Sequence, residues 1–245
     1  MTKNSPFKLD TKRSLAEQVA DRITELVVGG DLVAGDRLPP EVDLAIEMGV
    51  SRTALREGMR TLEAQGLLKI LPGVGTVVRE VGSDQLVQPL SLYVEVSDSE
   101  ISFEEFHAVR VILETEVAAL AAGAAVDSDV LILKGFMADM EMNVADADAF
   151  AASDASFHES LAKMASNPLF GLLIGALRVL LEDHIREVVG QIDPVTDVIP
   201  YHAAILEAVE DHDADSARRA MENHLAKVKK NYYSTVARGQ RKAHR

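Results

Sequence analysis

Helical periodicity is the pattern that most constrains this chain, and it continues with few breaks from about residue 84 to residue 232. The stretch "FEEFHAVRVILETEVAALAAGA" is amphipathic and rich in alanine, and three further helical stretches lie between Asp127 and Gly190. Two more follow Pro200, while "QIDPVTDVIP" is expected to be a loop and Pro168 to begin a helix. No β-prone run of comparable strength interrupts this half of the sequence. An antiparallel, all-α bundle is therefore predicted for residues 81–232.

The first 80 residues are organised differently. Helical spacing in "SLAEQVADRITELVVGG" ends at its Gly-Gly pair, Pro40 precedes a short helix, and Ser51 can cap a third helix, "RTALREGMRTLEAQG". Two β-prone runs, Leu67–Leu71 and Thr76–Arg79, follow around a Pro/Gly turn. Three helices and a short hairpin in this order are typical of a winged helix-turn-helix domain. The predicted fold class is mainly α, with this domain over residues 1–80 and the helical bundle after it.

The third predicted helix carries two distinct faces. At 3.6 residues per turn, one face is apolar and the other is basic. The apolar face holds Leu55, Met59 and Leu62, and the basic face holds Arg52, Thr53, Arg56 and Arg60. Guanidinium groups suit phosphates and the guanine edge in the major groove. A basic helix face can also be merely solvated, but its place between a turn and a hairpin favours DNA recognition.

Charge is unevenly distributed along the chain. The net charge is −14, yet residues 1–80 carry 11 Lys/Arg against 12 Asp/Glu, and residues 225–245 carry seven basic residues and no acidic ones. The acidity therefore lies in residues 81–224, so it does not argue against DNA binding by the first 80 residues. This asymmetry favours two domains with different tasks, followed by a basic tail over residues 233–245. Such a tail is expected to lie near DNA or to fray.

Composition excludes several kinds of site and location. No run of 18 apolar residues is present and the N-terminus lacks the apolar region of a secretory signal, so we expect a cytoplasmic protein without membrane contact. Cysteine is absent, which excludes disulfides and thiolate metal sites. A metal would have to be bound by imidazole and carboxylate groups.

One acidic and three histidine side chains are predicted to face the interior of the bundle. Asp154 and His158 lie four residues apart on an otherwise apolar helix face, in "SDASFHESLAKMASNP". His202 and His224 lie on the apolar faces of two other helices. Metal sites in helical bundles are built from such spacings, and a cation would offset the cost of burying Asp154. Zn²⁺ is the first candidate metal, with Ni²⁺, Mn²⁺ and Fe²⁺ as alternatives, although a single inward histidine is more often an ordinary core residue.

The first domain resembles the DNA-binding domain of the GntR family of bacterial transcription regulators. The resemblance is carried by "GDRLPPEVDLAIEMGVSRTALREGMRTLEAQGLLKILPGVGTVV". It implies that the side chains at the start of the third helix meet bases or phosphates, that Arg37 contacts the DNA backbone, and that two glycines let the wing approach the minor groove. The implied DNA-binding residues are Arg37, Ser51, Arg52, Thr53, Arg56, Arg60, Gly73 and Gly75. One departure is Val42, where the family often has an arginine.

The second domain resembles the FCD effector domain of the FadR-type branch of that family, through "DASFHESLAKMASNP" and "YHAAILEAVEDHDADSARRAMENHL". The resemblance implies metal ligation by the four inward residues, with a small organic acid completing the coordination. Candidate effector-binding residues are Arg110, Asn167 and Arg178. Arg110 could equally be a surface residue paired with Glu114, and capping the next helix is the alternative role of Asn167. His184 is a further possible ligand, whereas His107, His212 and His244 are expected to face solvent.

The predicted function is that of a metabolite-responsive transcription regulator, a repressor that binds a palindromic operator in double-stranded DNA as a homodimer. A small carboxylic acid bound at the metal would set its affinity for the operator. No catalytic residues are assigned. Two alternatives remain open at this stage, a metal-dependent hydrolase with a DNA-binding appendage and a regulator that senses the metal itself.

Overall fold

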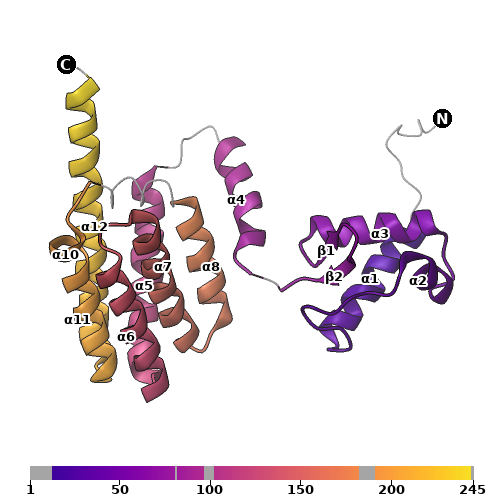
Figure 1. Ribbon diagram of the computed structural model, residues 1–245, viewed down its shortest axis with the longest axis horizontal. Helices are drawn as coiled ribbons and strands as arrows, with labels where there is room; N and C mark the ends of the chain where they lie inside the picture. Colours follow the sequence, from indigo (N-terminus) through magenta and orange to yellow (C-terminus); the bar gives the residue numbers. More distant parts are fainter. Residues whose placement is uncertain (1–12, 81, 97–101, 182–190, 244–245) are drawn as a thin grey trace, which may run out of the picture. The chain divides into compact units, whose positions relative to one another are not determined.

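The computed structural model describes residues 13–80, 82–96, 102–181 and 191–243, which fall into two compact units, Met1–Val81 and Gly82–Arg245 (Figure 1). The predicted fold class, a winged helix-turn-helix domain followed by an all-helical domain, is confirmed. Among the residues described, no helix is long and apolar enough to cross a membrane.

The first unit contains α1 (Leu15–Val28), α2 (Glu41–Glu47), α3 (Arg52–Ala64), β1 (Leu68–Leu71) and β2 (Gly75–Val78). Ser14 and Glu17 form a capping box that begins α1, and the Ser51 hydroxyl accepts a hydrogen bond from the Ala54 amide to begin α3. The two strands pair antiparallel, with Leu68 opposite Val78. An isolated bridge from Arg37 to Val77 extends this small sheet.

A single apolar core holds the first unit together. Its centre is formed by residues no more than 2 % exposed, namely Val19, Ile23, Leu55, Met59, Leu62, Leu68 and Val78. α1 and α3 pack closely at Gly58, where an added Cβ atom would lie 2.6 Å from the Ala16 carbonyl oxygen. The apolar side of α3 is thereby fixed against α1, which leaves the opposite side of the helix exposed.

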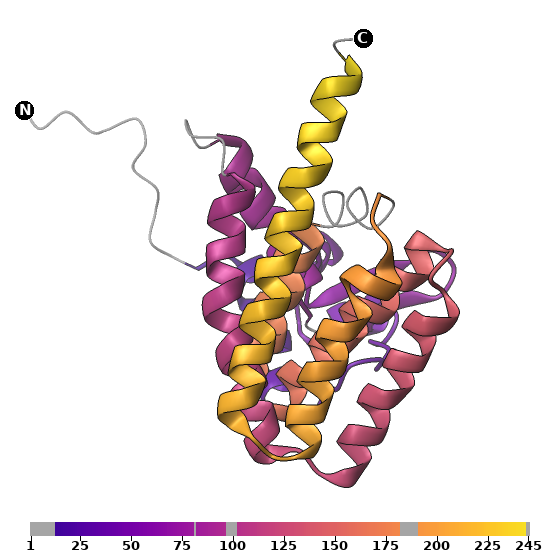
Figure 2. The ribbon, with the colours of Figure 1, turned by 90° about the vertical axis from the view of Figure 1, so that its left-hand side faces the viewer.

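The second unit is a bundle of helices: α4 (Asp84–Val96), α5 (Phe103–Ala124), α6 (Asp127–Met142), α7 (Ala147–Met164), α8 (Pro168–Leu180), α10 (Pro194–Asp197), α11 (Ile199–Glu210) and α12 (Ala214–Ala243). Helix α12 lies beside α5 and α11 (Figure 2). Helix α7 packs against three neighbours, α5, α6 and α8. The core between them is lined by alanine, methionine, leucine and phenylalanine side chains, with Phe150, Phe157, Leu161, Ile205 and Leu225 completely buried.

Two details of the bundle differ from the sequence-based expectation. The segment expected to be a loop contains the short helix α10 and the start of α11. Asp193 caps α10 through the Val195 amide, and a proline is the first residue of α10 and the second residue of α11, positions that favour the start of a helix. The basic tail does not form a separate frayed segment, since α12 continues through it to Ala243. Pro168 is the first residue of α8, as expected, and Asn167 caps this helix, which is the alternative role considered for it from the sequence.

Candidate metal centre and nucleic-acid interface

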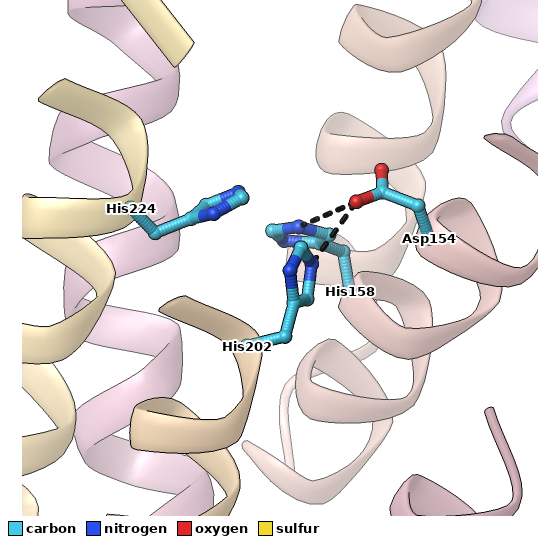
Figure 3. Close-up of side chains that lie close together, drawn as sticks. All are labelled: Asp154, His158, His202 and His224. Atoms are coloured by element: carbon cyan, nitrogen blue, oxygen red, sulfur yellow. Dashed lines mark ion pairs between the residues drawn. The ribbon is translucent and has the colours of Figure 1, made fainter. Parts of the chain in front are cut away.

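Three helices bring the four predicted metal ligands together inside the second unit. Helix α7 supplies Asp154 and His158, α11 supplies His202 and α12 supplies His224 (Figure 3). All four residues are buried, and one ligand atom from each lies within 4.8 Å of the others. The imidazole rings of His202 and His224 are 4.4 Å apart between centroids, and each lies 5.2–5.3 Å from the ring of His158.

A single carboxylate oxygen faces two of the imidazoles. Asp154 Oδ1 lies 3.0 Å from His202 Nε2 and 3.9 Å from His158 Nε2. Neither of these Nε2 atoms makes a hydrogen bond to any residue that the structure describes, although both are shielded from solvent. A cation between these atoms would be coordinated by two buried nitrogens and one buried oxygen, which is a suitable arrangement of metal ligands.

The outer nitrogen of each of these two imidazoles lies close to an oxygen atom on its other side. His202 Nδ1 lies 3.2 Å from the Val198 carbonyl oxygen, and His158 Nδ1 lies 2.5 Å from Glu114 Oε2. A protonated Nδ1 on either ring leaves Nε2 free to bind a metal. Glu114 is held in turn by Arg110, whose Nε donates a 2.6 Å hydrogen bond to Glu114 Oε1.

The charged groups of the centre stabilise one another's ionised forms. Burial acts to raise the pKa of Asp154, but Arg178, followed by His202, outweighs it and holds this pKa well below its ordinary value. Burial also acts to raise the pKa of Glu114, but Arg110 and His158 outweigh it and hold this pKa well below its ordinary value. Both carboxylates are therefore anionic near neutral pH.

Two of the imidazoles, by contrast, are held in their neutral forms. Burial lowers the pKa of His158, and the neighbouring Glu114 only partly counteracts it. Burial also lowers the pKa of His224, and His202 and His158 lower it further. Neutral imidazole is the form that binds metals. A set of three imidazoles and one carboxylate fits a divalent first-row transition metal and leaves room for an additional ligand.

Arg178 of α8 borders this centre and retains unused hydrogen-bonding capacity. Its Nη2 contacts Asp154 Oδ2, whereas its buried Nε and Nη1 have no hydrogen-bond partner among the described residues. A guanidinium group in this position can donate a charge-assisted hydrogen bond to an anionic ligand.

The other two candidate effector residues occupy different settings. Arg110 is 2 % exposed, so its pairing with Glu114 is a buried ion pair rather than the surface pair considered from the sequence. Asn167 is exposed, and its side chain accepts a hydrogen bond from the Leu169 amide.

The expectation for one of the other histidines was wrong, and two histidines lie outside the described residues. His107 was expected to face solvent but is only 4 % exposed, because it lies on the same side of α5 as Arg110 and Glu114 and its ring stacks on Phe103. His212 is exposed, as expected. His184 and His244 lie outside the described residues.

Glu114 lies next to the candidate metal ligands, but the sequence indicated it only as a possible partner of Arg110. A signal was present, since Glu114 follows Arg110 by four residues and precedes Val117, Ala118 and Ala121, which are all buried on the same side of α5. The signal was hidden because α5, which was expected to be amphipathic, carries polar side chains on its buried side too, so polarity did not identify the side directed to solvent.

The first unit presents the predicted nucleic-acid interface on α3 and the hairpin. Ser51, Arg52, Thr53, Arg56, Arg60 and Arg37 are all exposed. Arg56 donates from Nε to Glu41 Oε2 at 2.6 Å, so this arginine is held by α2. Gly73 and Gly75 have φ values of 75° and 117°, in the region that favours glycine. Val42 lies on α2 and is about half exposed.

Comparisons with known proteins agree with these observations in both units. Residues 15–78 match the family described as bacterial regulatory proteins, gntR family, and residues 105–227 match the FCD domain. A protein named for regulation of the L-lactate dehydrogenase operon in Escherichia coli (strain K12) is 34% identical over 88% of this chain and 85% of its own length. The transcriptional regulator LutR of Bacillus subtilis (strain 168) is 30% identical over 83% of this chain and 94% of its own.

A solved structure shows the same architecture. The GntR protein of Streptococcus agalactiae is 26% identical and superposes with a TM-score of 0.70, covering 88% of this chain and 99% of the other. The similar proteins named here are transcription regulators rather than enzymes, so the hydrolase alternative is set aside.

Proposed function

Because the chain belongs to the GntR family of bacterial transcription regulators and carries an FCD domain, we propose that it is a repressor controlled by a small organic acid bound at a metal ion. The observation that carries this proposal is the buried group of Asp154, His158, His202 and His224, with two orphaned Nε2 atoms at its centre. We take Zn²⁺ as the first candidate metal, with Ni²⁺, Mn²⁺ or Fe²⁺ as alternatives.

The proposed effector is a carboxylate anion. Arg178 supports this choice, because its Nε and Nη1 are buried beside the centre without a hydrogen-bond partner among the described residues. A metal-bound carboxylate could accept a hydrogen bond from one of these two donors while Nη2 keeps its contact with Asp154. The name of the Escherichia coli relative makes L-lactate the first acid to test. Arg110 and Asn167 have less support as effector contacts, since Arg110 is occupied by Glu114 and Asn167 caps α8.

DNA recognition is assigned to the exposed side of α3 and to the wing. Arg52, Thr53 and Arg56 would read bases or adjacent phosphates, with Ser51, Arg60 and Arg37 on the backbone. The left-handed conformations of Gly73 and Gly75 support a close approach of the hairpin to the minor groove. We also propose that the protein binds DNA as a homodimer, in which case two-fold protein symmetry would be matched by a palindromic operator. We place such a regulator in the cytoplasm, where its DNA is.

A thermal-melt screen of the full-length protein tests this function. Lactate, pyruvate, glycolate, gluconate and citrate are each added to protein loaded with Zn²⁺ and to protein stripped by a chelator. A ligand at 100 times its Kd adds about 2.7 kcal/mol to the free energy of unfolding, which a melt resolves. The proposal requires that at least one carboxylic acid stabilises the loaded protein and not the stripped protein.

Matched variants locate the effect. Asp154→Asn should abolish the acid-dependent shift, whereas Asp211→Asn, an exposed aspartate at the end of α11, should retain it. If chelation lowers the melting temperature but no acid has an effect, the metal is structural or is itself the signal. Operator binding that follows the free Zn²⁺ concentration alone would then establish a metal sensor and overturn the proposal.

A further inference from the structure

The two carboxylate oxygens of Glu114 face different groups: one faces an arginine, and the other faces a candidate metal-ligand histidine. Its Oε1 accepts from Arg110 Nε at 2.6 Å, and its Oε2 lies 2.5 Å from His158 Nδ1. The side chains of Glu114, Arg110 and His158 are all at most 2 % exposed. Burying an ionised carboxylate costs free energy unless paired groups are held next to it. Arg110 and His158 provide these paired groups for Glu114.

We propose that Glu114, oriented by Arg110, is a positioning residue of the metal centre that sets which nitrogen of His158 faces the metal. The proposal rests on the proposed function, because it requires the centre to bind a metal. When Oε2 accepts the Nδ1 proton of His158, Nε2 is left unprotonated, and Nε2 is the atom directed at Asp154 Oδ1. The Val198 carbonyl does the same for His202 through a peptide oxygen.

The contact with His158 distinguishes this role from that of an ordinary buried ion pair. Arg110 and Glu114 lie four residues apart on α5 and could neutralise each other without any third group. Glu114 instead reaches across to α7, where its buried Oε2 lies 2.5 Å from His158 Nδ1, and neither atom makes a hydrogen bond to any other described residue. An outer carboxylate also makes the imidazole a stronger ligand, and loss of such a partner typically costs 10–100-fold in metal affinity.

Charge balance around the centre gives Glu114 a second consequence. Asp154 and Glu114 are anionic, and Arg110 and Arg178 are cationic, so these four buried groups sum to zero. The charge of a bound divalent metal would then not be neutralised by the surrounding protein groups, and it would attract an anionic ligand. Removal of the Glu114 charge would leave Arg110 unpaired next to the metal site and would weaken cation binding for this reason too.

Competition with a chromophoric chelator measures the Zn²⁺ affinity of the stripped full-length protein and tests the proposal. Glutamine at position 114 offers one acceptor and one donor group, so it can satisfy Arg110 or His158 but not both. Glu114→Gln should therefore weaken Zn²⁺ binding by about 10–100-fold. Glu116→Gln is the matched control, because Glu116 lies on the same helix but is exposed and pairs with Arg218. It should leave the affinity unchanged.

The outcomes separate this proposal from the proposed function. Wild-type protein that binds none of Zn²⁺, Ni²⁺, Mn²⁺ and Fe²⁺ overturns both. Tight binding by wild type together with unchanged binding by Glu114→Gln overturns the role of Glu114 alone. If Glu114→Gln does not fold, ¹⁵N NMR of the Zn²⁺-loaded wild type decides, since a His158 that is protonated on Nε2 rather than on Nδ1 overturns the proposal.

Discussion

Ser83 lies directly against Gly175, so that the residue just before α4 rests on the backbone of α8. A Cβ atom built on Gly175 would lie 2.7 Å from both the Cβ and the Oγ of Ser83. Side chains do not approach so closely, so this contact depends on glycine at position 175. Gly175 also lies three residues before Arg178, which binds Asp154 of the metal centre. Helix α8 therefore connects the proposed effector site to the segment that follows the DNA-binding unit in the sequence.

Gly175→Ala should weaken the coupling between effector and operator. The added methyl group must displace Ser83 or α8, which we expect to cost about 1–3 kcal/mol of stability, the usual range for overpacking. Allosteric coupling typically changes affinity by about 5–150-fold. We expect the variant to lose at least half of the coupling free energy while it still binds Zn²⁺. Fluorescence anisotropy with an operator duplex, with and without the effector acid, measures the change.

Gly171→Ala is the matched control for this coupling experiment. Gly171 lies one helical turn earlier on α8, and its added Cβ would make only an ordinary contact, 4.0 Å from Ala162 Cβ. It should leave both stability and coupling close to the wild-type values. Equal coupling in the two variants would show that the contact between Ser83 and Gly175 carries no signal.

Arg56→Ala should weaken operator binding by at least tenfold, because the side chain lies on the exposed basic side of α3. Its ion pair with Glu41 orients the guanidinium group but contributes little stability, since both side chains are partly exposed. Gel shifts at fixed salt measure the effect, with Arg22→Ala as the control, an exposed arginine of α1 that pairs with Glu25. An affinity equal to that of the control would remove Arg56 from the interface.

Gly58→Ala should destabilise the DNA-binding unit although alanine is the better helix former. The added Cβ would lie 2.6 Å from the Ala16 carbonyl oxygen and 2.8 Å from Val19 Cγ1, and a backbone oxygen cannot move without shifting α1. We expect a net loss of about 1–3 kcal/mol, against a gain of up to about 1 kcal/mol in helix propensity.

Thermal unfolding measures this loss, with Gly135→Ala as the control. Gly135 lies inside α6 with nothing within 4 Å of its added Cβ. That control should be neutral or slightly stabilising, so the same result for Gly58→Ala would contradict the close packing of α1 and α3.

The sequence predicted the elements whose pattern is local and strong. The apolar spacing of Leu55, Met59 and Leu62 determines which side of α3 is buried, and the four-residue spacing of Asp154 and His158 places both on the inner side of α7. These inferences needed only the helical period. The same reasoning brought His202 and His224 to the interior, where the structure gathers all four residues.

The inferences that failed depend on contacts between distant segments. Helix α5 was expected to be amphipathic, but polar side chains lie on its buried side as well as on its exposed side, so its spacing could not show that His107 faces the core. Burial of Arg110 requires Glu114, and the second oxygen of Glu114 is directed at α7, 44 residues further along the chain. The continuation of α12 through the basic tail was likewise missed, because charge composition alone does not distinguish a solvated helix from a frayed end.

His107 should make the protein less stable as the pH falls. Burial, followed by the neighbouring Arg110 and Lys229, lowers the pKa of His107 to about 4, although Glu114 and Glu104 act in the opposite direction. The unfolded chain takes up this proton near pH 6.5 and the folded protein only near pH 4, so stability is lost as the pH falls through this interval. Between pH 7 and pH 5 the loss should be about 2 kcal/mol, at 1.36 kcal/mol per pKa unit.

Urea unfolding of wild type and of His107→Gln, both stripped of metal, measures this contribution as a difference. The remaining histidines are the same in both proteins, so the difference between the two pH profiles isolates His107. The variant should lose less stability than wild type between pH 7 and pH 5, and the two profiles should run parallel above pH 7.5. Profiles that remain parallel down to pH 5 would show that His107 is protonated in the folded protein, which its buried place against Phe103 does not allow.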